Sequence, residues 1–483
     1  MSRKPNILFL FADQMQGKVL EPDNACLTPN IDRLIQNGIR FARSYPACAI
    51  TSPSQASLMT GLLPHNHGML WVRHNVDDDQ GVFREQNPQW SQRLADAGYR
   101  MGFFCRWMVE RTNELERFGW TEYALPGSEA HKARSQELKK AHAVEQKYSM
   151  EACYDAPPGY KTGIFYGVTN VPPEARGLGI EASLAEDFLK DAVKGADPWC
   201  CFYSISEPHD PFVTGQEAFD QYDVDSIPLP PSAHDDLDGR PNIYKKAQQV
   251  WANRTDQEKR EAAACYYASI TEIDKMYGRL IDVVEQAGQL DNTIVIVSSD
   301  HGDLLGAHGL YCKNLTAAQE VYHIPLVFCG PGIAKGKVSN ALVGLHDVCP
   351  TLLELTGADP FASPDSKSFA SVLRDPDGES GAFDQGYAEY FGGRYMLTQR
   401  ILWNGPWKFA LNGFDFDELY HMEEDPFEMK NLAQDPGRQD VVKDMMRQIW
   451  ERIRDTNDHS LFNSHYPILR LAPYGPDILE EDA

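Results

Sequence analysis

Two carboxylates and one imidazole stand directly after strand-like apolar runs. Asp13 follows "NILFLFA" (6–12), and Asp300-His301 follow "NTIVIVSS" (292–299). In an open parallel sheet, ligands collect at the carboxyl ends of the strands. Two carboxylate oxygens and an imidazole nitrogen suit a divalent cation. The alternative is that each aspartate caps the turn after its strand, which is the commoner role of a lone aspartate there.

The stretch "TSPSQASLMTG" (51–61) offers a hydroxyl nucleophile. Ser52 is a typical N-cap and Pro53 suits the first helical position, which would leave Thr51 just outside a helix N-terminus. Free N–H groups and the helix dipole favour an alkoxide or oxyanion at that point. The same hydroxyl could instead serve only the capping loop. Both interpretations fit the spacing.

Four groups that can carry positive charge follow the same predicted strand ends: Arg106, His209, His308 and Lys313. The chain has 45 Lys and Arg against 70 Asp and Glu, so its net charge is −25. This charge argues against nucleic acid or an anionic membrane as a partner. An anionic substrate would therefore need a local cationic pocket, although each of these residues taken alone could be merely solvated or packed.

Helical and apolar strand-like segments alternate along the first 330 residues, which favours an α/β architecture with a mostly parallel sheet and helices on both faces. The segment 28–41 reads as an amphipathic helix with Thr28 as cap, Pro29 at its first position and Gly38 at its end. We expect further elements along the chain: a helix and then a strand at 89–105, a strand at 199–205, a long helix at 262–288 and a strand at 323–332.

The polar stretch 108–180 is expected to hold little regular structure. A Pro-, Gly-, Asp- and Ser-rich region at 357–383 suggests a domain boundary. We therefore expect a catalytic domain over 1–380 and a C-terminal subdomain with tail over 381–483, built from short antiparallel strands and a helix at 437–455.

The sequence favours a cytoplasmic protein. The apolar run after Met-Ser-Arg-Lys-Pro is too short for a signal peptide, and no apolar run is long enough to cross a bilayer. Ten scattered cysteines with no C-x-x-C pair indicate reduced thiols. The apolar tail "HYPILRLAPYGPDIL" (465–479) would pack on its own domain or on a second copy in a homo-oligomer.

Six ordered segments resemble the sulfatases of the alkaline phosphatase superfamily over nearly the full chain. They are "PNILFLFADQ", "TPNIDRLIQNGIRF", "TSPSQASLMTGLLPHNHG", "SEPHDPF", "DNTIVIVSSDHGDLLGAHGLYCK" and "DELYHMEEDPFEMKNLAQDP". The resemblance implies an alkaline-phosphatase-like sandwich: a large, mostly parallel sheet between helices, plus a small C-terminal subdomain with a short antiparallel sheet. The Asp13 and Asp300-His301 pattern looks closest to the choline sulfatase and phosphonate monoester hydrolase branch.

Three parts of the sulfatase pattern are changed in this sequence. Thr51 stands where the family has a cysteine or serine that becomes formylglycine, and Gln55 replaces the signature arginine. The family's G-K-W-H is Cys105-Arg106-Trp107-Met108. A threonine cannot give the aldehyde because its β-carbon carries a methyl group, so no formylglycine is expected.

The resemblance and the departures together predict a hydrolase of a small phosphate or phosphonate ester with Thr51 as nucleophile. One divalent ion (Ca, Mn, Mg or Zn) would be bound by Asp13, Thr51, Asp300 and His301. Gln55, Arg106 and Lys313 would bind the substrate, and His209 would be the general acid, with His308 as the alternative. Two other hypotheses stay open: a sulfatase that works without formylglycine, and a non-catalytic anion-binding homologue.

Overall fold

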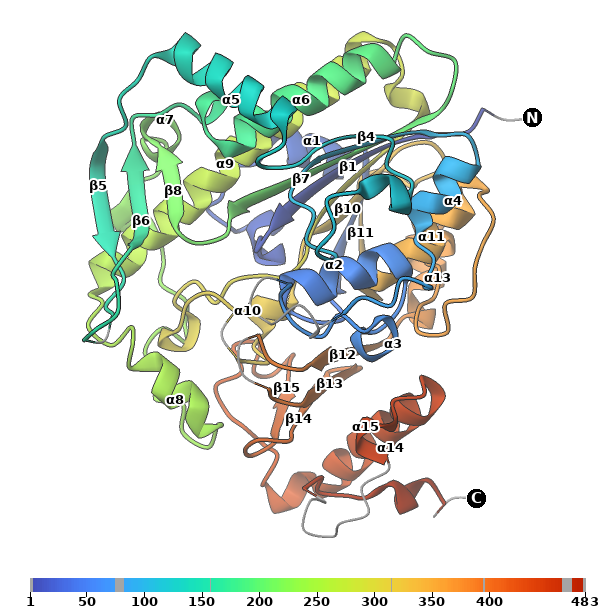
Figure 1. The fold of residues 1–483 in the computed structure, drawn as a ribbon. Coiled ribbons are helices and arrows are strands. Elements are labelled where there is room, and N and C mark those ends of the chain that lie inside the picture. The colour runs from blue at the N-terminus through green and yellow to red at the C-terminus, as the bar shows by residue number, and fades with distance from the viewer. Residues whose placement is uncertain are drawn as a thin grey trace.

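A computed structural model describes residues 3–73, 82–156, 158–313, 315–393, 396–462 and 471–480. Its largest sheet has eight strands in the order β11-β2-β10-β9-β1-β7-β3-β4 (Figure 1). These strands are β1 Asn6–Asp13, β2 Gly38–Tyr45, β3 Arg100–Cys105, β4 Glu122–Ala124, β7 Trp199–Pro208, β9 Thr293–Ser299, β10 Leu326–Cys329 and β11 Lys337–Gly344. All pair in parallel except β10, which runs antiparallel to both of its neighbours.

Helices cover both faces of this sheet because its central strands are apolar on both sides. Along β1, Ile7, Phe9 and Phe11 belong to one buried apolar cluster, while Leu8 and Leu10 belong to another. The first cluster is shared with α2 Thr51–Thr60, α4 Trp90–Asp96 and α11 Val348–Thr356. The second is shared with α1 Pro29–Gln36, α6 Gly177–Ala192 and α9 Asp256–Gln286. The sheet therefore lies between two helical layers (Figure 1).

A second, four-stranded antiparallel sheet follows in the last quarter of the chain. Its strands are β12 Gln385–Tyr390, β13 Gln399–Asn404, β14 Trp407–Asn412 and β15 Glu418–His421. Helix α14 (Gln439–Asp455) packs on it through a third apolar cluster. The expected fold class, a large mostly parallel sheet with a small antiparallel one, is confirmed. The described part of the C-terminal tail packs on this same unit, because Ile478 is buried in the third cluster.

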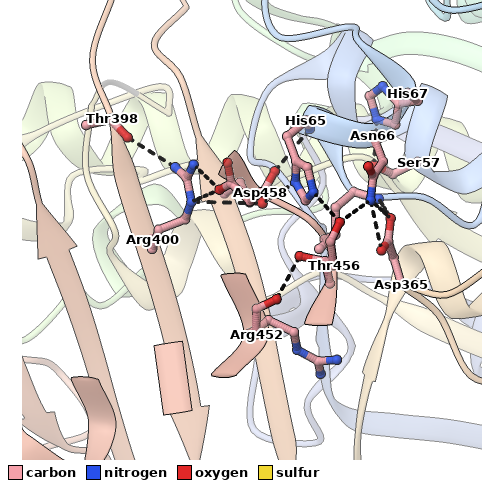
Figure 2. Close-up of polar contacts among 12 residues, drawn as sticks. Ser57, His65, Asn66, His67, Asp365, Thr398, Arg400, Arg452, Thr456 and Asp458 are labelled. Atoms are coloured by element: carbon pink, nitrogen blue, oxygen red, sulfur yellow. Dashed lines mark hydrogen bonds and ion pairs between the residues drawn. The ribbon is translucent and has the colours of Figure 1, made fainter. Parts of the chain in front are cut away.

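Buried polar contacts connect the small sheet and α14 to the helix that follows α2 (Figure 2). His65, on α3 (Pro64–His67), contacts Glu389 of β12 through Nδ1 at 2.7 Å and the Thr456 carbonyl through Nε2 at 3.0 Å. Arg400 of β13 donates to Asp458 at 2.6 Å. The turn after α2 is thus fixed to both elements of the C-terminal unit.

Several of the remaining elements differ from what the sequence led us to expect. The helix expected over 28–41 ends at Gln36, and 38–45 form strand β2. The stretch 108–180, expected to be irregular, contains α5 Glu129–His142, β5 Tyr148–Cys153 and β6 Ile164–Thr169, the last two forming a sheet with β8 Phe212–Gly215. Short helices complete the chain: α7 Gln216–Phe219, α8 Asn242–Gln248, α10 Gln319–Tyr322, α12 Ala370–Arg374, α13 Pro376–Glu379 and α15 His459–Phe462. Among the described residues, none of these helices has the length and apolar content to cross a membrane.

Candidate active site

Asp13, Asp300 and His301 form a buried group that we call the open cluster. Strands β1 and β9 are adjacent and parallel, with Ala12 opposite Ser299, so the residues after them meet at one edge of the sheet. One ligand-type atom from each of the three side chains lies within 4.8 Å of the others. The buried apolar runs of the two strands therefore determine where these polar groups stand.

Most carboxylate oxygens of the open cluster accept no hydrogen bond from the described residues. Both Asp13 side-chain oxygens and Asp300 Oδ2 are buried without a hydrogen-bond partner among the described residues. Burial and the neighbouring Asp13 charge raise the pKa of Asp300 well above its usual range. Unsatisfied buried carboxylates are costly, and a bound cation removes that cost. The residues present therefore fit a divalent metal ion, with Asp13, Asp300 and His301 as its holders.

The histidine of the open cluster is oriented as a ligand. His301 Nδ1 lies 3.0 Å from the Gly302 carbonyl and donates to it, which leaves the lone pair on Nε2. Burial first, and then the charge of Lys313, lower the pKa of His301 well below its usual range, which favours the neutral ring. Nε2 lies 3.6 Å from Asp13 Oδ1. Gly302 is required here because a Cβ would meet the Glu320 carbonyl at 2.0 Å.

Thr51 faces the open cluster. Its Oγ1 lies 3.3 Å from His301 Nε2, and its side chain is buried. Ser54 Oγ, on helix α2, donates a hydrogen bond to the Asp300 carbonyl at 2.7 Å. This bond holds the start of α2 against the end of β9. The helix begins at Thr51 itself, so the expectation that Ser52 caps it is wrong. Ser52 Oγ instead accepts from the Arg73 backbone N–H at 3.1 Å.

Three of the four predicted cationic groups lie at this site. Arg106 Nη1 is 3.5 Å from Asp13 Oδ2, and its side chain is 32% exposed, so it can reach an anion from solvent. Lys313 Nζ lies 3.1 Å from His209 Nε2. His209 Nδ1 contacts the Asp210 carbonyl at 2.8 Å, which orients the ring. Arg106 and Lys313 supply local positive charge at this edge of the sheet in an otherwise acidic chain.

The fourth cationic group, His308, lies in a different environment. Its Nδ1 pairs with Asp235 at 2.7 Å, and Arg240 pairs with the same carboxylate at 3.1 Å. Its ligand-type atoms group with Glu320 and Glu428 rather than with the open cluster. Among the described residues, no hydrogen bond or ion pair joins His308 to Thr51 or to the open cluster, so the structure does not bring His308 together with the other predicted site residues.

Gln55 lies one helical turn after Thr51 and is turned toward the protein. Its Oε1 accepts from the Met108 backbone N–H at 3.2 Å, and the residue is 5% exposed. The amide therefore supports the segment that carries Arg106. A role for Gln55 in binding substrate remains a prediction.

Sequence reasoning missed four residues that the structure brings to the site. Gln14, Asp210 and Asp303 form a buried network around Lys313. Arg73 lies near Arg106, whose charge adds to burial in lowering the pKa of Arg73. Gln14 and Asp210 directly follow the predicted residues Asp13 and His209, so adjacency was the available signal. Arg73 lies in the segment that follows α3, and no motif marked it.

Comparisons with known proteins identify the family of this chain. The Sulfatase family model matches residues 5–358, which is most of the chain. The chain belongs to the sulfatase family. A second model, described as N-sulphoglucosamine sulphohydrolase, C-terminal, matches residues 306–455 of this sulfatase-family protein.

Individual relatives include both sulfate-ester and phosphonate-ester hydrolases. The choline-sulfatase of Rhizobium meliloti (strain 1021) is 27% identical over 468 residues, covering 90% of this chain and 83% of that protein. The phosphonate monoester hydrolase of Silicibacter pomeroyi shares the fold with a TM-score of 0.77 at 21% identity, covering 95% of this chain and 97% of that one. A protein solved in complex with its substrate D-glucosamine-2-N,6-O-disulfate has a TM-score of 0.74 at 19% identity, covering 95% and 99%. This sulfatase-family protein is thus a hydrolase of the alkaline phosphatase superfamily.

Proposed function

We propose that the protein hydrolyses a small phosphate or phosphonate ester, with Thr51 as the covalent nucleophile. The observation that carries the proposal is the placement of a threonine hydroxyl, at the N-terminus of a buried helix, 3.3 Å from the ring nitrogen of the open cluster. Free N–H groups of the first turn of α2 favour negative charge on that oxygen. The similar proteins are named for sulfate and phosphonate esters, and a phosphorus ester is the class that we propose for this protein.

The residues of the site have separate roles in this reaction. A divalent cation held by Asp13, Asp300 and His301 would lower the pKa of the Thr51 hydroxyl and polarise a non-bridging oxygen of the ester. Thr51 Oγ1 releases its proton to solvent and attacks phosphorus, and the bond from phosphorus to the leaving oxygen breaks. Arg106 and Lys313 hold the oxygens on which charge accumulates.

His209 would give a proton from Nε2 to the leaving oxygen, a step that requires the ring to carry protons on both nitrogens when substrate binds. Its Nδ1 is held by Asp210, so the ring keeps a fixed direction while Nε2 faces Lys313 and the site. Water then attacks phosphorus in the threonine adduct, which releases the acid and restores the hydroxyl.

The chemistry of threonine favours phosphorus over sulfur. A formylglycine hydrate expels sulfate by breaking its own carbon–oxygen bond, because a second hydroxyl on that carbon takes over. A sulfated threonine has no second hydroxyl on its β-carbon. A phosphorylated threonine can instead be hydrolysed at phosphorus when a cation and an aligned water are present.

The second candidate is hydrolysis of a sulfate ester without formylglycine. Its support is the family itself, since the Sulfatase model covers residues 5–358 and the similar choline-sulfatase is named for a sulfate ester. In that case a water, rather than Thr51, would attack sulfur.

A panel of four substrates tests the proposal: an aryl sulfate, a phosphate monoester, a phosphate diester and a phosphonate monoester, each with Mn²⁺-supplemented protein. We expect turnover of a phosphorus ester above that of the aryl sulfate. Thr51→Ala should lower turnover of the phosphorus ester by about 10⁴-fold, and Thr51→Ser should keep much of that turnover. Ser52→Ala, which removes the adjacent hydroxyl on the same helix, is the matched control and should stay near the wild-type rate.

Each contrary outcome has a distinct meaning. Preferred turnover of the aryl sulfate with an unaffected Thr51→Ala variant would favour the second candidate. Anion binding without turnover of any ester would favour a non-catalytic homologue.

A further inference from the structure

Tyr154 connects the hairpin of β5 and β6 to the acid beside His209. It directly follows β5, in the stretch 108–180 that the sequence led us to expect as irregular. Its hydroxyl donates to Asp210 Oδ2 at 2.6 Å. A hydrogen bond from a hydroxyl to an ionised carboxylate is among the stronger ones in proteins. The hairpin therefore reaches the immediate neighbour of the proposed proton donor.

The ring of Tyr154 is held in place by the hairpin and not by the open cluster. Its centroid lies 5.1 Å from that of Phe165 on β6 and 5.8 Å from that of Trp251. The Tyr154 N–H donates to the Gly163 carbonyl at 2.9 Å, and the Thr162 hydroxyl donates to the Tyr154 carbonyl at 2.8 Å. Because the ring is packed on two others and the backbone is bonded on both sides, the hydroxyl has a fixed direction.

The two carboxylate oxygens of Asp210 have different partners. Oδ2 accepts from Tyr154, while Oδ1 lies 3.2 Å from His209 Nδ1 and accepts from Gln14 Nε2 at 3.2 Å. Burial would raise the pKa of Asp210, but the charge of His209, the hydrogen bond from Tyr154, the charge of Lys313 and the Gln14 amide together lower it. Asp210 is therefore an anion beside the imidazole at neutral pH.

An anionic Asp210 supports the form of His209 that the reaction requires. Giving a proton from Nε2 needs a ring protonated on both nitrogens, and Lys313 Nζ, 3.1 Å from Nε2, opposes that form because two positive charges then meet. The charge of His209 also acts on His301, which burial keeps neutral. The carboxylate at Nδ1 favours the doubly protonated ring as long as Oδ1 faces it. Without the Tyr154 hydroxyl, Oδ2 would lose its donor and the carboxylate would turn toward another one.

We infer that Tyr154 is a positioning residue that fixes the Asp210 carboxylate against His209 and so supports the doubly protonated ring that acts as general acid. The proton moves from Nε2 to the leaving oxygen, the ring becomes neutral with Nδ1–H retained, and it takes a proton back from the water that attacks the threonine adduct. The inference rests on the proposed function in taking His209 as the general acid. Tyr154 acts through Asp210, and His209 transfers the proton.

One test reads the His209 ring directly, without turnover. The full-length protein is labelled with ¹⁵N-histidine, supplied with Ca²⁺ and titrated with pH, and the His209 signals in the NMR spectrum are assigned by their loss in His209→Gln. Tyr154→Phe removes only the hydroxyl. We expect it to move the midpoint of the His209 titration to lower pH by about half a unit or more, because the carboxylate no longer faces Nδ1.

Tyr166→Phe is the matched control. Tyr166 lies on β6 of the same hairpin, and its hydroxyl also donates to a carboxylate at 2.6 Å, that of Glu261 on α9. No described hydrogen bond joins Tyr166 or Glu261 to His209 or Asp210. This substitution should leave the midpoint of the His209 titration unchanged and should affect only the melting temperature.

A second test uses the dependence of turnover on the leaving group. Two aryl phosphonate esters are compared, one with an acidic phenol that leaves readily and one with a weakly acidic phenol that needs a proton. Tyr154→Phe should slow the second ester by about 10-fold and the first by less than about twofold. In a His209→Ala background, the same substitution should slow neither ester by more than about twofold, since residues that act as a unit are not additive.

Two results would overturn the inference. One is an unchanged midpoint of the His209 titration in Tyr154→Phe. The other is equal slowing of both esters with and without His209, which would mean a general structural effect. A failure of the proposed function is distinct, because it would show as no turnover of any phosphorus ester by the wild type, and the NMR titration would still decide for or against the role of Tyr154.

Discussion

Among the described residues, three groups combine one histidine with two carboxylates, and two of these three differ in what balances their charge. The open cluster is Asp13, Asp300 and His301, and we call His65, Glu389 and Asp458 the closed cluster. In each, one ligand-type atom per residue lies within 4.8 Å of the others. Residue types and spacing alone would describe both as candidate metal sites.

The closed cluster is neutralised by the protein itself (Figure 2). Arg400, fully buried, donates to Asp458 at 2.6 Å, and Glu389 accepts from His65 Nδ1 at 2.7 Å. Burial alone would lower the pKa of His65, but the hydrogen bond and charge of Glu389, the Thr456 carbonyl and the charge of Asp458 together outweigh burial and raise the pKa to about 9, so the ring is charged at neutral pH. Two positive groups thus face two negative ones.

The open cluster has no such balance. Its histidine is neutral, and three of its carboxylate oxygens lack hydrogen-bond partners among the described residues. Of the cations beside it, Arg106 is a third exposed and 3.5 Å from Asp13, and Lys313 contacts Gln14 and His209. The comparison teaches that unsatisfied acceptors, more than the set of residue types, distinguish a metal-binding group from an internal ion pair.

The largest expected effect comes from removing a carboxylate of the open cluster. Asp300→Ala should lower turnover by at least about 10³-fold, because it takes away a metal ligand. Chelation should lower the melting temperature of the wild type and leave that of Asp300→Ala unchanged, as a differential scanning fluorimetry series with and without EDTA would show. The control is Asp458→Asn in the closed cluster, which should keep the chelator-induced shift. A full shift in Asp300→Ala would mean that the metal binds elsewhere.

The second effect comes from removing Arg400, the buried cation that contacts the closed cluster. Arg400→Met should lower the free energy of unfolding by about 3–5 kcal/mol, because it removes the guanidinium that pairs with buried Asp458. Urea unfolding measures this change. Arg374→Met, which breaks a surface pair with Glu354, should cost less than about 1 kcal/mol. Equal destabilisation by the two substitutions would contradict the distinction between buried and exposed pairs.

The sequence predicted the open cluster well because it follows from the sheet. The apolar runs of β1 and β9 identified buried parallel strands, and parallel strands bring their carboxyl ends together. Thr51 was found because Pro53 and the helix formers after it mark a helix start. These are local signals with direct spatial consequences.

Other features depend on contacts that local patterns do not carry. His308 follows the predicted metal segment closely, but its φ of 55° turns the chain there, and its ring pairs with Asp235, which is 73 positions away. Helix α5 has no buried residue, so an apolar rhythm could not indicate it. Gln14 was adjacent to a predicted ligand, but only its left-handed backbone brings its amide to Lys313.

A smaller, pH-dependent effect should come from His65. Because its folded pKa is about 9, above the unfolded value of about 6.5, its contribution to stability is fully present below pH 6.5 and is lost as pH rises through 9. The difference in unfolding free energy between wild type and His65→Gln should therefore be larger at pH 6 than at pH 9.5, by on the order of 3 kcal/mol. His234→Gln, at a side chain 67% exposed, should show no such pH dependence. A constant difference for His65→Gln across this range would mean that the ring is uncharged when folded.

The most direct measurement of the central claim, that Thr51 beside the open cluster forms a covalent adduct with phosphorus, is acid quenching during turnover followed by mass spectrometry of the peptide containing residue 51. We expect a phosphoryl or phosphonyl group on Thr51 in the wild type with metal present, and none in Asp300→Ala. Turnover of a phosphorus ester with an unmodified Thr51 peptide, and with Thr51→Ala near the wild-type rate, would contradict the claim and would leave water as the attacking group.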